Sequence, residues 1–439
     1  MNHTALHTGM DIFPLPAKRR DEHIAILGLG YVGLPLGLSF ARSFANVTGY
    51  DIAEARVRDL IHGKDMTGEV TATELNKTTM VASCHAADLA EATTFIVTVP
   101  TPIDAFKQPD LKPLQSACAT VARYLKPGDL VMFESTVYPG VTEEVCVPIL
   151  EEFSGLTAGD HFNFGYSPER INPGDKLRPF RKIAKLISAD SDAALTRAEG
   201  IYRSVIDADL HLCASIKIAE AAKALENTQR DVNIALMNEM SEIFDRINVP
   251  VQDVIRAAST KWNFLPFTPG LVGGHCIGVD PHYLIALAER EGVAPTIISS
   301  ARRANTAVPD RILKTVLKHA AKRKGPTRVA QLGLTFKPDV PDIRNSLSLR
   351  LAKDLVETGL DPMFADPFLD QSDVDRTGIQ LSDPAEWQDV DILILSVPHA
   401  EILTAAPWAN CLNKNALVID VSSAIPKSSL PSDAQSWSL

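Results

Sequence analysis

Residues 270–283 form a glycine-rich segment that holds a single cysteine, Cys276, followed four residues later by a carboxylate, Asp280. Glycine lets the backbone approach a ligand closely. A cysteine in such a loop can act as a nucleophile when its thiolate is stabilised. The same chain carries a dinucleotide-binding pattern at residues 28–33. A nicotinamide site together with a reactive cysteine indicates oxidation of a carbonyl through a thioester, which would carry an alcohol through an aldehyde to an acid.

Two other interpretations of this loop stay open on its residues alone. A free cysteine is often a small hydrophobic side chain with no chemical role. His275, Cys276, Asp280 and His282 are also possible zinc ligands, but their spacing lacks a familiar structural-zinc pattern and no second Cys/His pair is evident. The rest of the sequence decides between these interpretations, and we assign no metal to the loop.

The dinucleotide pattern lies in the sequence context that it requires. Residues 23–27 predict a strand, residues 28–33 read Gly-Leu-Gly-Tyr-Val-Gly, residues 34–44 predict a helix, and a strand at 46–50 ends at Asp51. In such a strand–turn–helix unit the pyrophosphate lies on the helix N-terminus. The carboxylate after the second strand would accept from the ribose hydroxyls and repel a 2′-phosphate. This arrangement favours NAD over NADP.

Further candidate groups lie at strand ends and on a long predicted helix. Val99–Thr101 and Ser135–Thr136 follow predicted strands, at the edge where open α/β sheets bind ligands. Lys223 and Asn227 are spaced i, i+4 and share one helix face, where a partly buried lysine can stabilise an oxyanion. Taken alone, this pair favours a solvated helix surface, and Thr136 favours a simple helix cap.

The composition bounds the class of protein. The chain has 439 residues, a net charge of −11 and six cysteines without close pairs. The length predicts two or three domains, and the negative charge argues against a general binder of nucleic acid or anionic membranes. The scattered cysteines are typical of a reducing cytosol, no apolar run reaches membrane-spanning length, and the first 20 residues lack a signal-peptide pattern. We therefore expect a cytoplasmic protein.

The order of predicted strands and helices gives an α/β fold with two Rossmann-like domains joined by a long central helix. Apolar strands that alternate with helices predict parallel sheets covered on both faces. Residues 214–247 contain neither Pro nor Gly and predict a helix of roughly 50 Å, whose apolar residues predict a homodimer. We expect an N-terminal extension at 1–21, an NAD-binding domain at 22–210, a central helical dimerisation region with the Cys loop at 211–300, and a second Rossmann-like domain at 301–439.

Several longer motifs together resemble one known family. They cover about residues 23–425 and resemble the nucleotide-sugar 6-dehydrogenases, the group containing UDP-glucose dehydrogenase and UDP-N-acetylmannosamine dehydrogenase. The sequence of residues 270–284 is most similar to that of the branch that acts on UDP-N-acetylglucosamine or UDP-N-acetylgalactosamine in bacterial surface-polysaccharide synthesis. The motifs are Gly-Leu-Gly-Tyr-Val-Gly at 28, Ser-Thr-Val at 135, Ser-Pro-Glu-Arg at 167, Ala-Glu-x-x-Lys-x-x-x-Asn at 219, Gly-Gly-His-Cys at 273 and Phe-Lys-Pro-Asp-x-x-Asp-x-Arg-Asn-Ser at 336.

The resemblance implies that C6 of the sugar is oxidised twice, with two NAD and one water, to a uronic acid. Cys276 would attack the C6 aldehyde, and the resulting thiohemiacetal would be oxidised to a thioester that water hydrolyses. Lys223 and Asn227 would stabilise the oxyanions. Asp280 would handle protons through water or pair with Lys223, and Glu169 together with Thr136 would position the water.

The resemblance also implies contacts with both ligands. The second Rossmann-like domain would bind UDP, with Lys337 near the hinge and Arg344 near the cofactor cleft. Pattern and resemblance together give a cofactor set of Gly28, Gly30, Tyr31, Val32, Gly33, Asp51, Ile52, Arg56, Val99, Pro100, Thr101, Ser135, Thr136 and Arg344. The corresponding substrate set is Glu169, Arg170, Ile171, Lys223, Asn227, Phe267, Gly270, Gly273 and Lys337.

Two departures from the UDP-glucose enzymes bear on the substrate. Those enzymes carry a second glutamate four residues after the one at Glu169, where this chain has Pro173. The loop at 261–267, Lys-Trp-Asn-Phe-Leu-Pro-Phe, differs in length and composition from their Arg-containing segment. Both differences suit a pocket reshaped around an N-acetyl group. We therefore expect UDP-N-acetylglucosamine or its C4 epimer as the substrate, with UDP-N-acetylmannosamine and UDP-glucose as alternatives.

Two alternatives come from other classes of protein. A two-electron β-hydroxyacid dehydrogenase also pairs a Rossmann domain with a Lys/Asn helix, but it needs neither Cys276 nor the domain at 325–425. An NAD-binding regulator on the same fold would not need Lys223, Asn227, Cys276 and Asp280 together. The yield of NADH separates the three classes, since it would be two per sugar for the 6-dehydrogenase, one for the hydroxyacid enzyme and none for a regulator.

Overall fold

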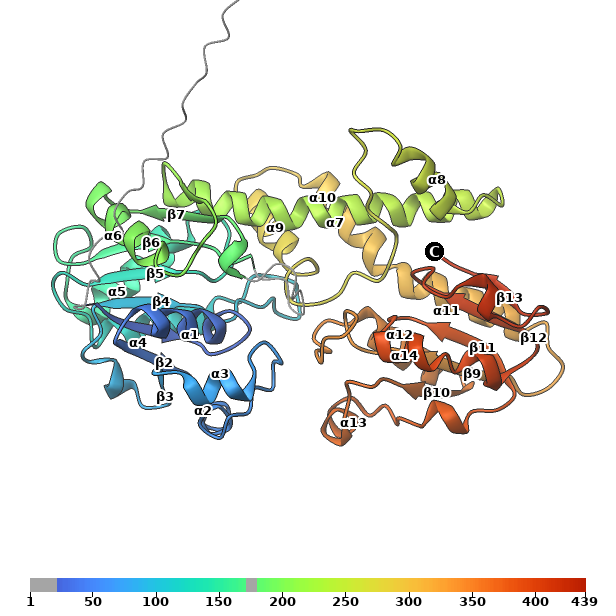
Figure 1. Cartoon of the computed structure of the whole chain (residues 1–439). Coiled ribbons are helices and arrows are strands. Elements are labelled where there is room, and N and C mark those ends of the chain that lie inside the picture. Colours follow the sequence, from blue (N-terminus) through green and yellow to red (C-terminus); the bar gives the residue numbers. More distant parts are fainter. Residues whose placement is uncertain (1–21, 171–179) are drawn as a thin grey trace, which may run out of the picture.

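One long helix connects two α/β domains. The computed structural model describes residues 22–170 and 180–439. The helix α7 (Ile216–Arg246) runs along the top of the N-terminal domain and continues over the C-terminal domain (Figure 1). Its 31 residues correspond to about 46 Å at 1.5 Å per residue. The predicted α/β fold with a long central helix is therefore confirmed, and among the residues described no helix combines the length and apolar character needed to cross a membrane.

The N-terminal sheet has the strand order that a dinucleotide-binding fold requires. Within the described residues it contains eight strands in the order β3-β2-β1-β4-β5-β6-β7-β8, and of the pairs in this sheet only β6 and β7 are antiparallel. Its central strands are short apolar runs, as expected for a sheet covered on both faces. The strands are β1 (His23–Leu27), β2 (Asn46–Tyr50), β3 (Val81–Ser83), β4 (Thr94–Val97), β5 (Leu130–Phe133), β6 (Asn163–Tyr166), β7 (Lys185–Ala189) and β8 (Leu210–Leu212).

Helices pack on both faces of this sheet and form two hydrophobic clusters. One cluster contains the apolar side of α4 and α5, and the other contains α1 and α6. β4 ends at Val97, and just beyond it the Thr98 hydroxyl donates to the carbonyls of Leu27 and Gly28 at 3.0 and 2.8 Å. The helices are α1 (Gly33–Ser43), α2 (Glu54–Ile61), α3 (Ala72–Lys77), α4 (Lys112–Ala122), α5 (Val147–Ser154) and α6 (Asp192–Tyr202).

The C-terminal sheet is entirely parallel and lacks a glycine fingerprint. Its five strands, counted over the described residues, have the order β10-β9-β11-β12-β13. The strands are β9 (Arg328–Leu332), β10 (Asp361–Ala365), β11 (Val390–Leu395), β12 (Leu412–Asp420) and β13 (Gln435–Trp437), and the helices are α11 (Val308–Ala320), α12 (Leu347–Glu357), α13 (Gln371–Thr377), α14 (Ala400–Ala405) and α15 (Trp408–Cys411).

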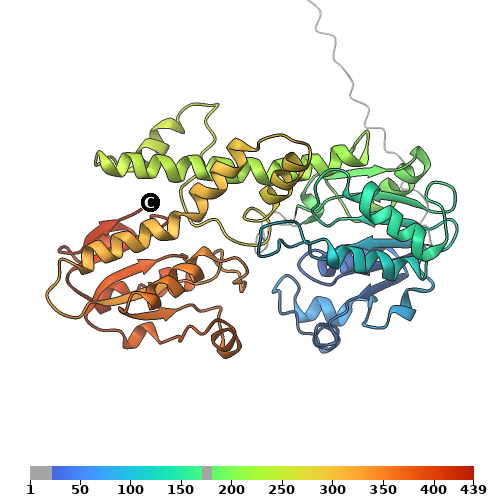
Figure 2. The same cartoon turned by 180° about the vertical axis from the view of Figure 1, so that it is seen from behind.

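Three further helices join the domains: α8 (Val251–Ala258), α9 (Asp280–Arg290) and α10 (Thr296–Thr306). The view from behind shows α9 and α10 beside α7, with α11 leading into the C-terminal domain (Figure 2). Buried polar groups fix α10 on α7, since Arg302 and Asn305 both donate to the Asp231 carboxylate, at 2.5 and 2.7 Å. This packing sets the place of the segment 259–279 that contains the cysteine.

Candidate active site

The turn between β1 and α1 has the geometry of an anion site. Gly28 has φ +95°, and a Cβ on Gly33 would lie 1.8 Å from the Gly28 carbonyl oxygen, so both positions need glycine. A Cβ on Gly30 would meet no atom within 4 Å, which leaves open space above the turn. Val32 precedes α1 without a side-chain cap, and the first turn of α1 carries no acidic residue. The residues present therefore fit a pyrophosphate at this helix N-terminus, beside the side chain of Tyr31.

Asp51 lies at the end of β2, next to this turn. Its two carboxylate oxygens accept from the backbone N–H groups of Leu29 and Ala53 at 2.8 and 2.9 Å, which fixes its orientation. Ile52 beside it is exposed. Arg56 donates from Nε to the Leu29 carbonyl and forms an ion pair with Asp65, so it supports the turn from the side. A stacking role of Arg56 at the adenine stays a prediction.

The loops after β4 and β5 are tied to each other and to α9. The Ser135 hydroxyl donates to the Val99 carbonyl at 2.6 Å, and the Thr101 hydroxyl donates to the Thr136 carbonyl at 2.7 Å. The Tyr283 hydroxyl on α9 donates to the Thr101 carbonyl at 2.6 Å. Pro100 is exposed between these contacts. Hydrogen bonds therefore connect the two predicted cofactor loops at this edge of the sheet, and they also connect these loops to α9, the helix that follows the cysteine.

The Cys loop, residues 270–279, packs closely against the C-terminal domain. Cys276 is half-buried, and its carbonyl accepts from the backbone N–H of Asp280 at 2.8 Å as α9 begins. A Cβ on Gly273 would lie 2.7 Å from the Asn345 carbonyl oxygen, and Gly274 has φ +86° with its Cβ position 2.7 Å from the Phe336 ring. The two glycines thus let the loop approach residues of the C-terminal domain closely.

Lys223, Asn227 and Asp280 are brought together beside this loop, and all three side chains are buried. Asn227 Nδ2 donates to Asp280 Oδ2 at 2.5 Å, and Lys223 Nζ donates to the Glu169 carbonyl oxygen at 2.6 Å. The interpretation of the Lys/Asn pair as a solvated helix surface is therefore wrong. Within the described part of the chain, Asn227 Oδ1 is buried without a hydrogen-bond partner, and such an atom can accept from a bound substrate.

Burial changes the protonation of this cluster. Removal of water raises the pKa of Asp280 to about 6, against the opposing effects of Lys223 and Asn227. A carboxyl group with this pKa can exchange a proton near neutral pH, as a general base requires.

An aromatic and charged cluster links the two domains at the cysteine. The His275 ring stacks on Tyr31 of the glycine turn at 5.6 Å between centroids and lies 3.6 Å from Asp342. The Arg344 guanidinium lies over the Tyr31 ring and donates to Asp342 at 2.6 Å. Burial opposes a charge on His275, but Asp342 and the Cys276 sulfur outweigh it and raise its pKa to about 9. The sequence singled out neither Tyr31–His275 stacking nor Asp342 as a partner of Arg344.

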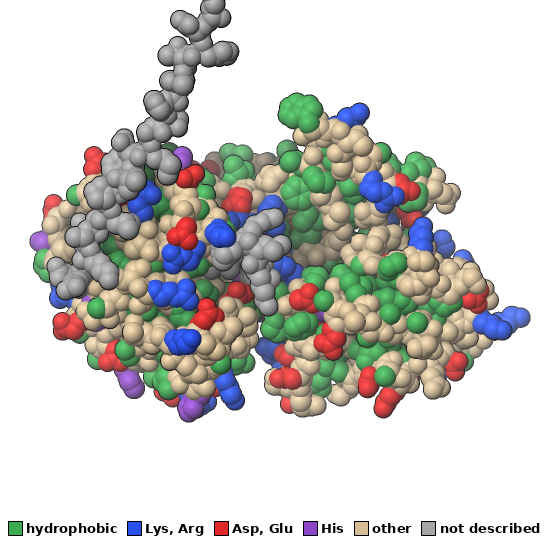
Figure 3. Space-filling model, viewed as in Figure 1, with side chains coloured by type: hydrophobic (Ala, Val, Ile, Leu, Met, Phe, Trp, Pro, Cys, Tyr) green, Lys and Arg blue, Asp and Glu red, His purple; other side chains and the backbone are tan. Residues whose placement is uncertain are grey.

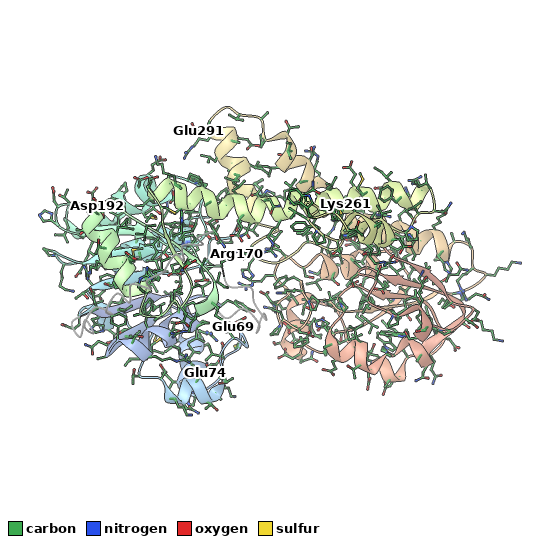
Figure 4. The ribbon with its side chains drawn as sticks, turned by 45° about the horizontal axis from the view of Figure 1, so that its top comes forward. Glu69, Glu74, Arg170, Asp192, Lys261 and Glu291 are labelled. Atoms are coloured by element: carbon green, nitrogen blue, oxygen red, sulfur yellow. The ribbon has the colours of Figure 1, made fainter. Side chains whose placement is uncertain are left out.

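Glu169 turns its carboxylate away from solvent. Glu169 Oε2 accepts from Lys185 Nζ, and Glu169 Oε1 accepts from the backbone N–H of Arg170. Lys185 also contacts Glu134, and sequence reasoning missed both of these residues. The Arg170 side chain pairs with Glu226, and Figure 4 shows Arg170 between the two domains, beneath α7.

The remaining substrate candidates lie along the segment before the cysteine. Asn238 on α7 accepts from the Gly270 N–H at 2.8 Å and donates to the Gly270 carbonyl at 3.1 Å, a clamp that the sequence did not reveal. Phe267 is half-buried against Met237, Val251 and Ile255. Ile171 lies outside the described residues.

A cavity of about 170 Å³ opens beside Gly270 at the carboxyl ends of β9, β11 and β12, the edge where open α/β sheets bind ligands. Lys337 is half-buried in the loop after β9. The loop tip at 261–263 is outside this cavity: Trp262 is 97% exposed, and Lys261 lies along the far half of α7 (Figure 4). The cavity is lined by Gly270, Leu271, Thr335, Phe336, Pro338, Leu347, Ser348, Ser396, Val397, Pro398, Val421 and Ser422.

Comparisons with known proteins agree with this geometry. Three models of the UDP-glucose/GDP-mannose dehydrogenase family match the chain: the NAD binding domain at 22–206, the central domain at 217–307 and the UDP binding domain at 330–427. The chain is 45% identical over 387 residues to the UDP-N-acetyl-D-glucosamine 6-dehydrogenase of Pseudomonas aeruginosa, covering 87% of this chain and 92% of that protein. It is 43% identical to Protein CapL of Staphylococcus aureus over 95% of this chain and all of that protein.

A solved structure of UDP-D-ManNAc dehydrogenase from Pyrococcus horikoshii is similar over 94% of this chain and 98% of its own, with a TM-score of 0.83 and 29% identity. These findings confirm the resemblance that the motifs predicted, and the matched N-terminal domain identifies NAD as the cofactor. The chain belongs to the UDP-glucose/GDP-mannose dehydrogenase family and is a nucleotide-sugar dehydrogenase.

Proposed function

We propose that this enzyme oxidises C6 of a UDP-N-acetylhexosamine, UDP-N-acetylglucosamine or its C4 epimer, to the uronic acid in surface-polysaccharide synthesis. The observation that carries the proposal is the convergence of Cys276 with Lys223, Asn227 and Asp280, between the glycine turn and the cavity of the C-terminal sheet. The overall reaction is RCH₂OH + 2 NAD⁺ + H₂O → RCOO⁻ + 2 NADH + 3 H⁺. Two NAD molecules, bound one after the other at the glycine turn, would each accept one hydride.

The buried groups of this chain have distinct tasks in the proposal. Asp280, ionised above its pKa of about 6, takes protons from the sugar hydroxyl and the attacking water. The Cys276 thiolate adds to the C6 aldehyde to form a thiohemiacetal, which is oxidised to a thioester. Water then adds to the thioester carbon, the C–S bond breaks, and the acid leaves. Lys223 and Asn227 stabilise the oxyanions from buried positions, where such interactions are strong.

The residues before the cysteine support an N-acetyl sugar. The clamp between Asn238 and Gly270 holds this segment next to the cavity, and Phe267, three residues earlier in the chain, packs against Met237, Val251 and Ile255. Rigid apolar side chains suit an acetyl methyl group, while backbone groups serve its amide. The relatives named UDP-N-acetyl-D-glucosamine 6-dehydrogenase are 44–45% identical to this chain, whereas those named UDP-N-acetyl-D-mannosamine dehydrogenase are 31–33% identical.

A panel of UDP-sugars tests the proposed substrate. We expect kcat/KM for UDP-N-acetylglucosamine or UDP-N-acetylgalactosamine to exceed that for UDP-glucose by about a hundredfold or more, because a site built for an amide leaves buried polar groups unpaired without it. Two NADH should form per sugar consumed. Comparable kcat/KM for UDP-glucose, or a preference for UDP-N-acetylmannosamine, would contradict the substrate while leaving the family intact.

The preference for NAD over NADP is tested at Asp51. Its carboxylate should repel the 2′-phosphate of NADP, so the unchanged enzyme should prefer NAD. Asp51→Ala removes the negative charge and the oxygens that accept from two backbone N–H groups. It should weaken NAD binding by about tenfold to a hundredfold and reduce the preference for NAD over NADP. Asp51→Asn keeps an acceptor, so it should narrow the preference with a smaller loss of NAD affinity. A preference for NADP before mutation would refute this assignment.

A homodimer is the expected assembly. Ile218, Leu225, Leu236, Ile243 and Ile247 are exposed apolar residues on or just after α7, and Figure 3 shows hydrophobic side chains gathered between α7 and the C-terminal domain. Two copies of α7 that pack together would cover such a surface. Light scattering at micromolar concentration should give twice the 47.6 kDa mass of the chain. A monomeric mass with full activity would contradict this prediction.

A cytoplasmic location completes the proposal. It rests on the six free cysteines of the described residues, which fit a reducing compartment.

A further inference from the structure

The ammonium group of Lys185 is buried and is connected to Lys223 through Glu169. It has no task in the proposed reaction. Lys185 begins β7, which runs antiparallel to β6. Its Nζ is 2.9 Å from Glu134 Oε2, 2.9 Å from Glu169 Oε2 and 3.4 Å from the Pro168 carbonyl oxygen. An ammonium has three N–H donors, so each donor has an acceptor, and two of the three acceptors belong to the adjacent residues 168 and 169.

Glu169 connects this ammonium to Lys223. Its carboxylate accepts from Lys185 and from the Arg170 N–H, while its backbone carbonyl oxygen accepts from Lys223 Nζ at 2.6 Å. The carboxylate and the carbonyl belong to one residue, so a contact that fixes the carboxylate also restricts the direction of the carbonyl. The position of the Lys223 ammonium therefore depends on the hydrogen bonds that Lys185 donates to residues 168 and 169.

The charges of the cluster argue for a geometric task. Glu134 and Glu169 share one ammonium, and all three side chains are buried. The Tyr202 hydroxyl donates to Glu134 Oε1 at 2.5 Å, and the Lys185 ammonium lies over the Tyr202 ring. Buried ion clusters add little stability, because the cost of desolvation offsets their attraction. What this cluster does provide is a fixed direction for each group that contacts it.

We propose that Lys185 is a positioning residue for the oxidation, which sets the place of the Lys223 ammonium through the side chain and carbonyl of Glu169. This inference rests on the proposed function, in which Lys223 stabilises the oxyanions. Glu134 is the matched control. It accepts from Lys185 at the same distance as Glu169 does, 2.9 Å, but its side chain bonds to Lys185 and Tyr202 and not to residues 168–170.

Two variants separate positioning from general stability. Glu134→Gln keeps an acceptor for Lys185 and is expected to leave kcat within about twofold of the unchanged enzyme. The double variant Glu134→Gln/Lys185→Met is used because Lys185→Met alone would leave two buried carboxylates facing each other, which costs folding stability. We expect the double variant to lower kcat by about a hundredfold, the size of a lost oxyanion contact, with KM for the UDP-sugar changed less than about threefold.

Hydrogen exchange gives a second readout that does not need the substrate. The Arg170 amide, which donates to the Glu169 carboxylate, should exchange at least about tenfold faster in the double variant but not in Glu134→Gln. Unchanged kcat and unchanged Arg170 exchange in the double variant would overturn the proposal, as would equal losses of kcat in both variants. If the unchanged enzyme oxidises no UDP-sugar, the proposed function fails, and the exchange of Arg170 still decides whether Lys185 holds this segment.

Discussion

Cys276→Ser should slow formation of the uronic acid by on the order of 10³-fold or more, the scale of losing a catalytic nucleophile. The serine hydroxyl is a far poorer nucleophile than a thiolate when no base is dedicated to it. Asp280 contacts Asn227 in the structure, and His275 stacks on Tyr31 and meets the Phe336 ring edge-on. The measurement is the rate of uronic acid formation with saturating NAD and UDP-sugar.

Single-turnover kinetics show which step the variant loses. The first hydride leaves the sugar alcohol without help from sulfur, so Cys276→Ser should stop after one NADH per site, or, if the serine adds to the aldehyde, form a second NADH and stop at a covalent ester. The control is Cys84→Ser, since Cys84 is also partly accessible but lies at the far edge of the N-terminal sheet, just after β3. Near-normal uronic acid from Cys276→Ser would remove the thioester mechanism.

Asp280 should set the acid limb of the pH profile. Burial raises the pKa of Asp280 to about 6, so kcat/KM should fall about tenfold per pH unit below that value as the base is protonated. Asp280→Asn should abolish this limb and lower the plateau by about 10²- to 10⁴-fold, the typical contribution of general base catalysis. The profile of the unchanged enzyme and that of the variant are measured with the same UDP-sugar.

The stability of Asp280→Asn serves as the control. A carboxyl group whose pKa is raised on folding binds its proton more tightly in the folded state, so its stabilising contribution is present below the unfolded pKa and is lost as the pH rises through about 6. At pH 7.5 the asparagine removes this penalty, and its side-chain oxygen can still accept from Asn227. Tm should therefore not fall. An acid limb that persists in the variant would assign it to another group.

The local parts of the site could be predicted because their signals lie within a few residues. Strands at 23–27 and 46–50 and the turn between them agree with the structure, since the glycine spacing and the following apolar helix face specify each other. The pairing of Lys185 with Glu134 and Glu169 could not be predicted. It depends on the antiparallel strand β7, whose polar first residue reads as a loop until its partners across the sheet are known.

The same limit applies to contacts between domains. Asn238 lies on the same face of α7 as Asn227 and Asp231, but only the packing of the segment before the cysteine shows that it binds Gly270. Phe336 explains two glycines of the Cys loop, but it is more than sixty positions away in the chain. Such contacts are decided by how the two sheets meet.

The stack of Tyr31 on His275, with Arg344 above it, joins the glycine turn of one domain to the loop and hinge of the other. Any ligand that shifts this contact changes the free energy of both binding sites together. Thermodynamic linkage makes such an effect reciprocal. If a UDP-sugar changes the affinity for NAD by some factor through this contact, NAD must change the affinity for the UDP-sugar by the same factor.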